Sequence, residues 1–185
     1  MKINHPTKQC ICNALIELMK DIDIDKISAK QLAEKANVSR ATLYHYYSSV
    51  DDVLYEIEED FFERMRDNSR YYISSSLDST NLHEPNSAVI AIAEFFKANK
   101  EAYLSLTGPH GDQRFSPRLH KCIREFYLGK LAYEGVNRKD MDMYVEFVLA
   151  GSDGVIRYWL EKREDMKCEE VAPIIQNILY GPFLK

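Results

Sequence analysis

The sequence SAKQLAEKANVSRATLYHYY, residues 28–47, decides the fold of this chain. Ser28 and Gln31 form a capping-box pattern, which predicts that a helix begins there. The pattern breaks at Asn37 and Val38, and Ser39 is a suitable N-cap for a second short helix over about 40–46. Two short amphipathic helices joined by a three-residue turn have the dimensions of a helix-turn-helix.

The second of these helices has two faces of different chemistry. Its inner face is predicted to consist of Ala41, Leu43 and Tyr47. Its outer face suits a DNA groove, because arginine pairs with guanine or phosphate, a threonine methyl contacts thymine, and tyrosine hydroxyls reach phosphates. A helical hairpin that only packs is the alternative, but outward aromatic side chains make a poor solvated surface. The predicted DNA-binding residues are Ser28, Lys30, Ser39, Arg40, Thr42, Tyr44, His45 and Tyr46.

The remainder of the 185 residues also follows a helical period. Apolar residues recur at three- and four-residue spacing from Ile11 to Met19, and one long helix is expected to run to about Ile73. A polar connection over 74–87 follows. Further helices are predicted at 88–100, 101–107, 116–134, 139–163 and 169–180. Because no alternating strand pattern occurs, the predicted fold class is all-α.

Charge and composition narrow the classes of function. The net charge is −5, but residues 1–48 carry +2 and residues 49–185 carry −7, so a basic head is joined to an acidic body. Four scattered cysteines outline no disulfide framework, and the thiols of Cys10 and Cys12 diverge on a helix. No metal, cofactor, catalytic motif or membrane-spanning run is predicted. The chain is therefore expected to be a cytoplasmic protein that is not an enzyme.

Residues 38–54, VSRATLYHYYSSVDDVL, resemble the signature of the TetR family of transcriptional regulators. The preceding amphipathic helix and residues 31–36 resemble it too, so the detailed resemblance covers about residues 7–57. It implies a three-helix DNA-binding domain over 1–48, whose third helix enters the major groove, and a helical ligand-binding and dimerisation domain over 49–185. Val50 departs from the pattern, because relatives usually carry a lysine there, near a phosphate.

The C-terminal body resembles the family in the layout of its helices. Within the family it resembles a short-chain branch near the regulators of dihydroxyacetone kinase operons, and the residues that carry this resemblance are 108–115, Phe147, Gly151, Gly154 and Trp159. Glycines three apart in a helix favour close approach of another helix. A symmetric four-helix dimer interface is predicted, and closure of the monomer core is the alternative. The predicted interface residues are Gly151, Gly154, Val155, Tyr158, Trp159, Ile174, Ile175 and Ile178.

A pocket for an unknown small-molecule effector is predicted between the fourth helix and the helices at 88–134. For each candidate lining residue, ordinary core packing is the alternative. The candidates are Phe61, Met65, Phe95, Phe96, Tyr103, Phe126 and Tyr127.

These observations predict a ligand-responsive repressor that binds a palindromic site on double-stranded DNA as a homodimer. The alternative is an interaction or co-regulator protein on the same scaffold with weakened DNA binding. Val50 and the acidic total charge favour that alternative.

Overall fold

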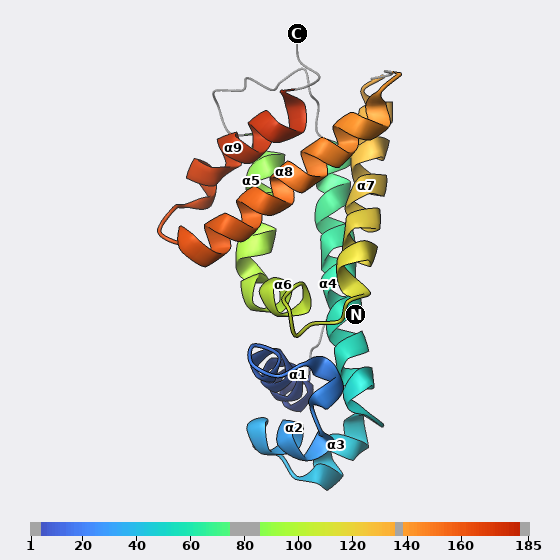
Figure 1. Cartoon of the computed structure of the whole chain (residues 1–185), viewed down its shortest axis with the longest axis vertical. Coiled ribbons are helices and arrows are strands. Elements are labelled where there is room, and N and C mark those ends of the chain that lie inside the picture. Colours follow the sequence, from blue (N-terminus) through green and yellow to red (C-terminus); the bar gives the residue numbers. More distant parts are fainter. Residues whose placement is uncertain (1–4, 75–85, 136–138, 182–185) are drawn as a thin grey trace. The chain divides into compact units, whose positions relative to one another are not determined.

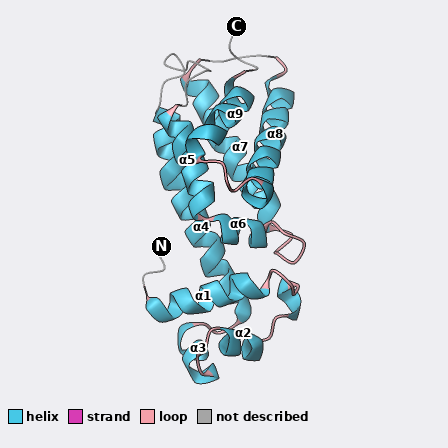
Figure 2. Cartoon of the chain, turned by 90° about the vertical axis from the view of Figure 1, so that its left-hand side faces the viewer, coloured by secondary structure: helices cyan, strands magenta, loops and turns pink. Residues whose placement is uncertain are grey.

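The computed structural model describes residues 5–74, 86–135 and 139–181, and every regular element in these ranges is helical (Figures 1 and 2). This confirms the all-α prediction. The polar connection predicted over 74–87 falls mostly outside the described residues. The helices are α1 (Pro6–Leu18), α2 (Ala29–Lys35), α3 (Arg40–Tyr46), α4 (Val50–Ser74), α5 (Ser87–Ala98), α6 (Lys100–Leu106), α7 (Phe115–Tyr133), α8 (Met141–Lys162) and α9 (Cys168–Tyr180), with a 3-10 turn at Ile24–Lys26.

The contacts divide the chain into two compact units, and neither is continuous in sequence. The first unit comprises residues 1–64 and 101–117, which include α1 to α3, the beginning of α4, and α6 with the loop that follows it. The second unit comprises residues 65–100 and 118–185. The grouping of α6 with the N-terminal helices is a tertiary feature that no local pattern indicates.

The core of the first unit forms where the apolar faces of its helices meet. Ile11 and Leu15 of α1 are fully buried, as are Leu32 of α2 and Phe61 of α4. The ring of Phe61 lies edge-on to the ring of Phe115, with their centroids 5.6 Å apart. This packing fixes α4 against the beginning of α7 within the unit.

The loop after α6 is tied to the turn between α1 and α2. The backbone N–H of Ile24 donates to the carbonyl oxygen of His110 at 3.0 Å, and Nδ1 of His110 lies 2.5 Å from Oδ1 of Asp23. The hydroxyl of Ser105, on α6, donates to the carbonyl oxygen of Ile16 at 3.2 Å. These bonds explain why residues 101–117 belong to the same unit as α1.

In the second unit, α9 packs against both α5 and α8. Its core contains buried tyrosines, among them Tyr127, whose hydroxyl donates to the carbonyl oxygen of Leu179. Lys130 is also fully buried, and its ammonium lies 2.9 Å from Oε1 of Glu134. The amide oxygen of buried Gln176 accepts from the backbone N–H of Asn86 at 2.7 Å, which ties α9 to the start of α5.

Candidate nucleic-acid interface

The turn between α2 and α3 is fixed by local hydrogen bonds. The capping box predicted at Ser28 is present: the backbone N–H of Gln31 donates to Oγ of Ser28 at 3.3 Å, and the backbone N–H of Ser28 donates to Oε1 of Gln31 at 2.9 Å. After α2, Asn37 adopts a left-handed backbone with φ of 54°, a conformation that asparagine tolerates better than most residues. The N–H of Val38 then donates to the carbonyl oxygen of Ala33 at 3.0 Å, which closes the turn.

Ser39 caps α3, as its position in the sequence predicts. Its Oγ accepts from the backbone N–H of Thr42 at 2.9 Å and lies 2.8 Å from Oγ1 of Thr42. Thr42 is half-buried. The hydroxyls of Ser39 and Thr42 therefore make hydrogen bonds at the N-terminus of α3. The methyl group of Thr42 is the part of that side chain that suits contact with a base.

The inner face of α3 is narrower than the sequence pattern predicts. Leu43 and Tyr47 are buried, as expected, but Ala41 is exposed, which corrects its placement on the inner face. Successive residues in an α-helix turn by about 100°, so Ala41 lies about 200° from Leu43 and on the same side as His45. Ala41 therefore joins the outward surface, where its methyl group suits contact with a thymine methyl.

The other outward residues of α3 form two contacting pairs, Arg40 with Tyr44 and His45 with Tyr46. The guanidinium of Arg40 lies over the ring of Tyr44, 5.9 Å from its centroid, and 48% of Tyr44 is exposed. The ring of His45 lies edge-on to the ring of Tyr46, with their centroids 4.9 Å apart.

At the start of α2, Ser28 and Lys30 are exposed, and the ammonium of Lys30 lies 3.9 Å from Oε1 of Glu34. Of the predicted DNA-binding residues, only Thr42 and Tyr46 are half-buried, and all the others are exposed.

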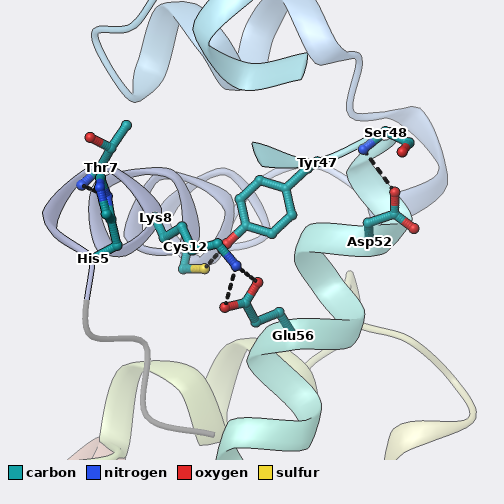
Figure 3. A network of polar contacts seen from close by, with 8 residues as sticks. All are labelled: His5, Thr7, Lys8, Cys12, Tyr47, Ser48, Asp52 and Glu56. Carbon is teal, nitrogen blue, oxygen red and sulfur yellow. Dashed lines mark hydrogen bonds and ion pairs between the residues drawn. The ribbon is translucent and has the colours of Figure 1, made fainter. Parts of the chain in front are cut away.

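Tyr47 anchors the C-terminal end of α3 to α1 and α4 (Figure 3). Its phenol oxygen lies 3.5 Å from Sγ of Cys12, on α1. The ammonium of Lys8 lies over the Tyr47 ring, 5.0 Å from its centroid, and donates to both carboxylate oxygens of Glu56, on α4, at 2.7 and 3.0 Å. This network joins three helices, and no pattern within any one of them indicates it.

Burial widens the pH range over which the thiol of Cys12 and the phenol of Tyr47 stay neutral. Burial raises the pKa of the Cys12 thiol to about 11, and it raises the pKa of Tyr47 far above its ordinary value, with the hydrogen bond to Cys12 adding to the shift. Both groups therefore stay protonated at neutral pH, so each can donate a hydrogen bond within the network.

The start of α4 is capped by its own carboxylate. The backbone N–H groups of Ser48 and Ser49 donate to Oδ2 of Asp52 at 2.9 and 3.0 Å, and the N–H of Asp52 donates to Oγ of Ser49 at 3.1 Å. Val50 is the first residue of α4 and is half-buried. The Asp52 carboxylate therefore already accepts backbone N–H groups at this end of the helix, which a phosphate could otherwise accept from. The first turn also carries two aspartates, Asp51 and Asp52, beside Val50.

The residues predicted for a dimer interface divide by burial. Trp159 and Ile175 are buried, and the indole N–H of Trp159 donates to the carbonyl oxygen of Met166 at 3.1 Å. Both side chains pack within this chain, which corrects their placement in an interface. Gly154, Tyr158 and Ile174 are exposed, whereas Gly151, Val155 and Ile178 are half-buried.

Two further apolar side chains of α8 are exposed, Met143 by 68% and Phe147 by 64%. They precede Gly151, Gly154 and Tyr158 at helical spacing, so these five residues form one stripe, which we call the α8 stripe. The predicted interface residues include neither Met143 nor Phe147, although both are exposed on the same side of α8. The signal that could have found them is the continuation of the same spacing toward the beginning of the helix.

The residues predicted to line a pocket are divided between the two units. Phe61 and Tyr103 belong to the first unit, where Phe61 packs on Phe115, and both are buried. The other five belong to the second unit, and all of these are buried except Phe126, which is half-buried; they are Met65, Phe95, Phe96, Phe126 and Tyr127.

No helix within the parts of the chain that the structure describes is both long enough and apolar enough to cross a membrane.

Two protein-family models match the chain. The model described as "Bacterial regulatory proteins, tetR family" matches residues 11–57. The model described as "Transcriptional regulator C-terminal region" matches residues 83–181, which is more than half of the chain. Both are models of transcriptional regulators, in agreement with the prediction that the chain is not an enzyme.

Two curated proteins are similar to this chain. An uncharacterized HTH-type transcriptional regulator of Bacillus subtilis (strain 168), YxbF, is 25% identical over 166 residues, which cover 90% of this chain and 43% of that protein. The HTH-type dhaKLM operon transcriptional activator DhaS of Lactococcus lactis subsp. lactis (strain IL1403) is 34% identical over 73 residues, which cover 39% of each. The matched part thus spans less than half the length of either relative. The match to DhaS agrees with the resemblance to regulators of dihydroxyacetone kinase operons.

Among solved structures, the chain is similar to the transcriptional regulator FadR from Bacillus subtilis in complex with stearoyl-CoA. The TM-score is 0.62 at 13% identity, and the match covers 95% of this chain and 99% of that chain. At this identity the likeness concerns the fold alone.

Proposed function

The chain belongs to the TetR family of transcriptional regulators, and from this premise we propose that it represses transcription by binding a palindromic operator as a homodimer. In this proposal residues 1–48 bind DNA, and residues 49–185 bind the effector and the second copy. The observation that carries the proposal is the outward surface of α3. Arg40, Ala41, Tyr44 and His45 are exposed together, while Tyr47 fixes the end of the helix to α1 and α4.

The proposed roles on DNA follow from chemistry and position. Recognition helices of this motif read base edges with their N-terminal residues, so Arg40, Ala41 and Thr42 are the proposed base-reading residues. Tyr44 lies further along α3, and its hydroxyl is proposed to reach a phosphate. Ser28 and Lys30 lie at the start of α2, and the first helix of such a motif crosses the phosphate backbone. Ser39 caps the start of α3 and is proposed to contact a phosphate there. Tyr46 belongs to the backbone contacts because it lies in the last turn of α3.

Selection from a pool of random duplexes tests the DNA-binding part. We expect enrichment of a palindrome whose half-sites lie about one helical turn, or a multiple of it, apart. Binding to the selected duplex is expected to weaken steeply between about 50 and 200 mM salt, because contacts of lysine and arginine with phosphates release counterions. A pool that enriches no palindrome would favour the co-regulator alternative. Two features of the start of α4 support that alternative: the Asp52 carboxylate already accepts the backbone N–H groups of Ser48 and Ser49, and Val50 carries no positive charge.

The homodimer is proposed on the α8 stripe. Phe147 and Tyr158 are 64% and 61% exposed, Gly154 has open space around it, and Ile174 of α9 is also exposed. Large exposed apolar side chains in a row mark interaction surfaces, and a twofold axis would pair the stripe with itself. Sedimentation equilibrium tests this. We expect a dimer that Phe147→Glu dissociates, whereas Tyr55→Glu, at a tyrosine that is 63% exposed on α4, leaves it intact.

The effector is proposed to bind among Met65, Phe95, Phe96, Phe126 and Tyr127 of the second unit. The support is their aromatic and apolar character and the stearoyl-CoA complex of the similar fold. A thermal-shift screen with stearoyl-CoA, followed by a DNA-binding assay with each hit, tests it. A hit that raises the Tm and releases DNA supports repression relieved by the effector. A hit that strengthens DNA binding supports an activator, which is what DhaS is named.

A further inference from the structure

Tyr46 on α3 meets His5 at the start of α1. The phenol oxygen of Tyr46 lies 3.3 Å from Nε2 of His5, and the two ring centroids lie 4.9 Å apart with an interplanar angle of 46°. His45 contacts the Tyr46 ring with its own ring, at 4.9 Å and edge-on. Two imidazoles therefore restrict the Tyr46 ring, and one of them, His45, is among the predicted DNA-binding residues.

The hydrogen bonds of His5 determine which of its ring nitrogens carries the proton. Nδ1 of His5 accepts from the backbone N–H of Thr7 at 3.3 Å, which makes His5 the N-cap of α1 (Figure 3). A neutral imidazole has one N–H and one acceptor nitrogen, so the proton lies on Nε2. Nε2–H then donates to the phenol oxygen of Tyr46. The hydroxyl hydrogen of Tyr46 is consequently left to donate to a different acceptor.

From this geometry we infer that His5 is a positioning residue for DNA binding, which orients the Tyr46 hydroxyl to donate to a backbone phosphate. The inference rests on the proposed function and adds a residue to the DNA-binding set. A phosphate oxygen is the fitting acceptor, because it only accepts hydrogen bonds and because Tyr46 lies in the last turn of α3, away from the base-reading start of the helix. Holding the tyrosine in place before binding lowers the entropy cost of the contact.

The test separates this role from the helix cap that His5 also provides. His5→Ser keeps a favourable N-cap residue but removes the imidazole that reaches Tyr46. Tyr46→Phe keeps the ring but removes the hydroxyl. The two single variants and the double variant are measured for affinity to the selected duplex and to a scrambled duplex of equal length. Gln9→Ala is the matched control, because Gln9 is exposed on the same helix and its side-chain amide donates to Asn13 at 3.0 Å.

We expect Tyr46→Phe to weaken binding to both duplexes by roughly tenfold, because a phosphate contact carries no sequence information. His5→Ser is expected to weaken binding several-fold with Tyr46 present and to add no loss in the Tyr46→Phe background. The Tm is expected to stay unchanged in every variant, and Gln9→Ala is expected to bind as the unsubstituted protein does.

Three results would overturn the inference while the proposed function stands: no loss in His5→Ser, an equal loss in both backgrounds, or a loss confined to the selected duplex. Absence of binding to any duplex by the unsubstituted protein would overturn both the inference and the proposed function.

Discussion

Val50→Lys is predicted to strengthen DNA binding and to steepen its dependence on salt. Val50 is the first residue of α4 and the place where the sequence departs from the usual lysine. Side chains three and four residues apart are neighbours on a helix surface. For position 50 these neighbours are Val53 and Leu54, so no carboxylate at that spacing pairs with the new ammonium. The carboxylate of Asp52 is already held by the N–H groups of Ser48 and Ser49. The lysine is therefore available to a phosphate.

The magnitude follows from counterion release. Each lysine–phosphate contact steepens the slope of log K against log salt by about 0.9, so two heads of the proposed dimer add about 1.8. Between about 50 and 200 mM salt, this steeper slope weakens the affinity by about a further 12-fold. The helix itself loses about 0.3–1 kcal/mol, because a cation at a helix N-terminus opposes the helix dipole. Fluorescence anisotropy over a salt series, with urea unfolding in parallel, measures both quantities.

Two control variants separate the contact from other effects of the substitution. Val50→Met changes the side chain without adding charge and is expected to leave the salt slope unchanged. Ala132→Lys adds the same charge at an exposed position on α7, in the second unit. A slope that is unchanged in Val50→Lys, or that steepens equally in Ala132→Lys, would refute the placement of this helix end beside a phosphate.

Three other predictions test the first unit, and a fourth, at Gly129, tests the second unit. Arg40→Ala is expected to cost about 1–3 kcal/mol on the selected duplex and little on a scrambled one, measured by anisotropy, whereas an equal loss on both would assign Arg40 to a phosphate. The pKa of Cys12 is raised by folding to about 11, from an ordinary 9.0, so the stability that it contributes is complete below pH 9 and lost as the pH rises through 11. Urea unfolding across that range is expected to show a steeper loss than in Cys12→Ala, and equal losses would contradict the buried thiol. Gly111→Ala is expected to destabilise the protein by about 2 kcal/mol in thermal unfolding, because a Cβ there would lie 2.3 Å from the carbonyl oxygen of Leu106. Gly129 lies on α7, and a Cβ added there would meet no atom within 4 Å beyond the neighbouring backbone of its own helix, so Gly129→Ala is expected to stabilise the protein by about 1 kcal/mol.

The sequence alone determined the helical architecture and the helix-turn-helix within it. Caps such as Ser28 with Gln31, and Ser39 with Thr42, act over three residues. Helix boundaries set by such caps can be read without knowing any other part of the chain. The family resemblance extends this to the approximate place of each α3 residue that is proposed to face DNA.

Only the tertiary structure decided which faces are covered. Ala41 is exposed and Trp159 is buried, although apolarity and spacing predicted the reverse for each. The contact of Tyr47 with Cys12 joins residues 35 positions apart, and that of His5 with Tyr46 joins residues 41 apart. A helical period reports that a helix has an apolar side, but it does not report which other helix, or which second copy of the chain, covers that side. Burial and the contacts between helices depend on that choice, which is made by segments distant in sequence.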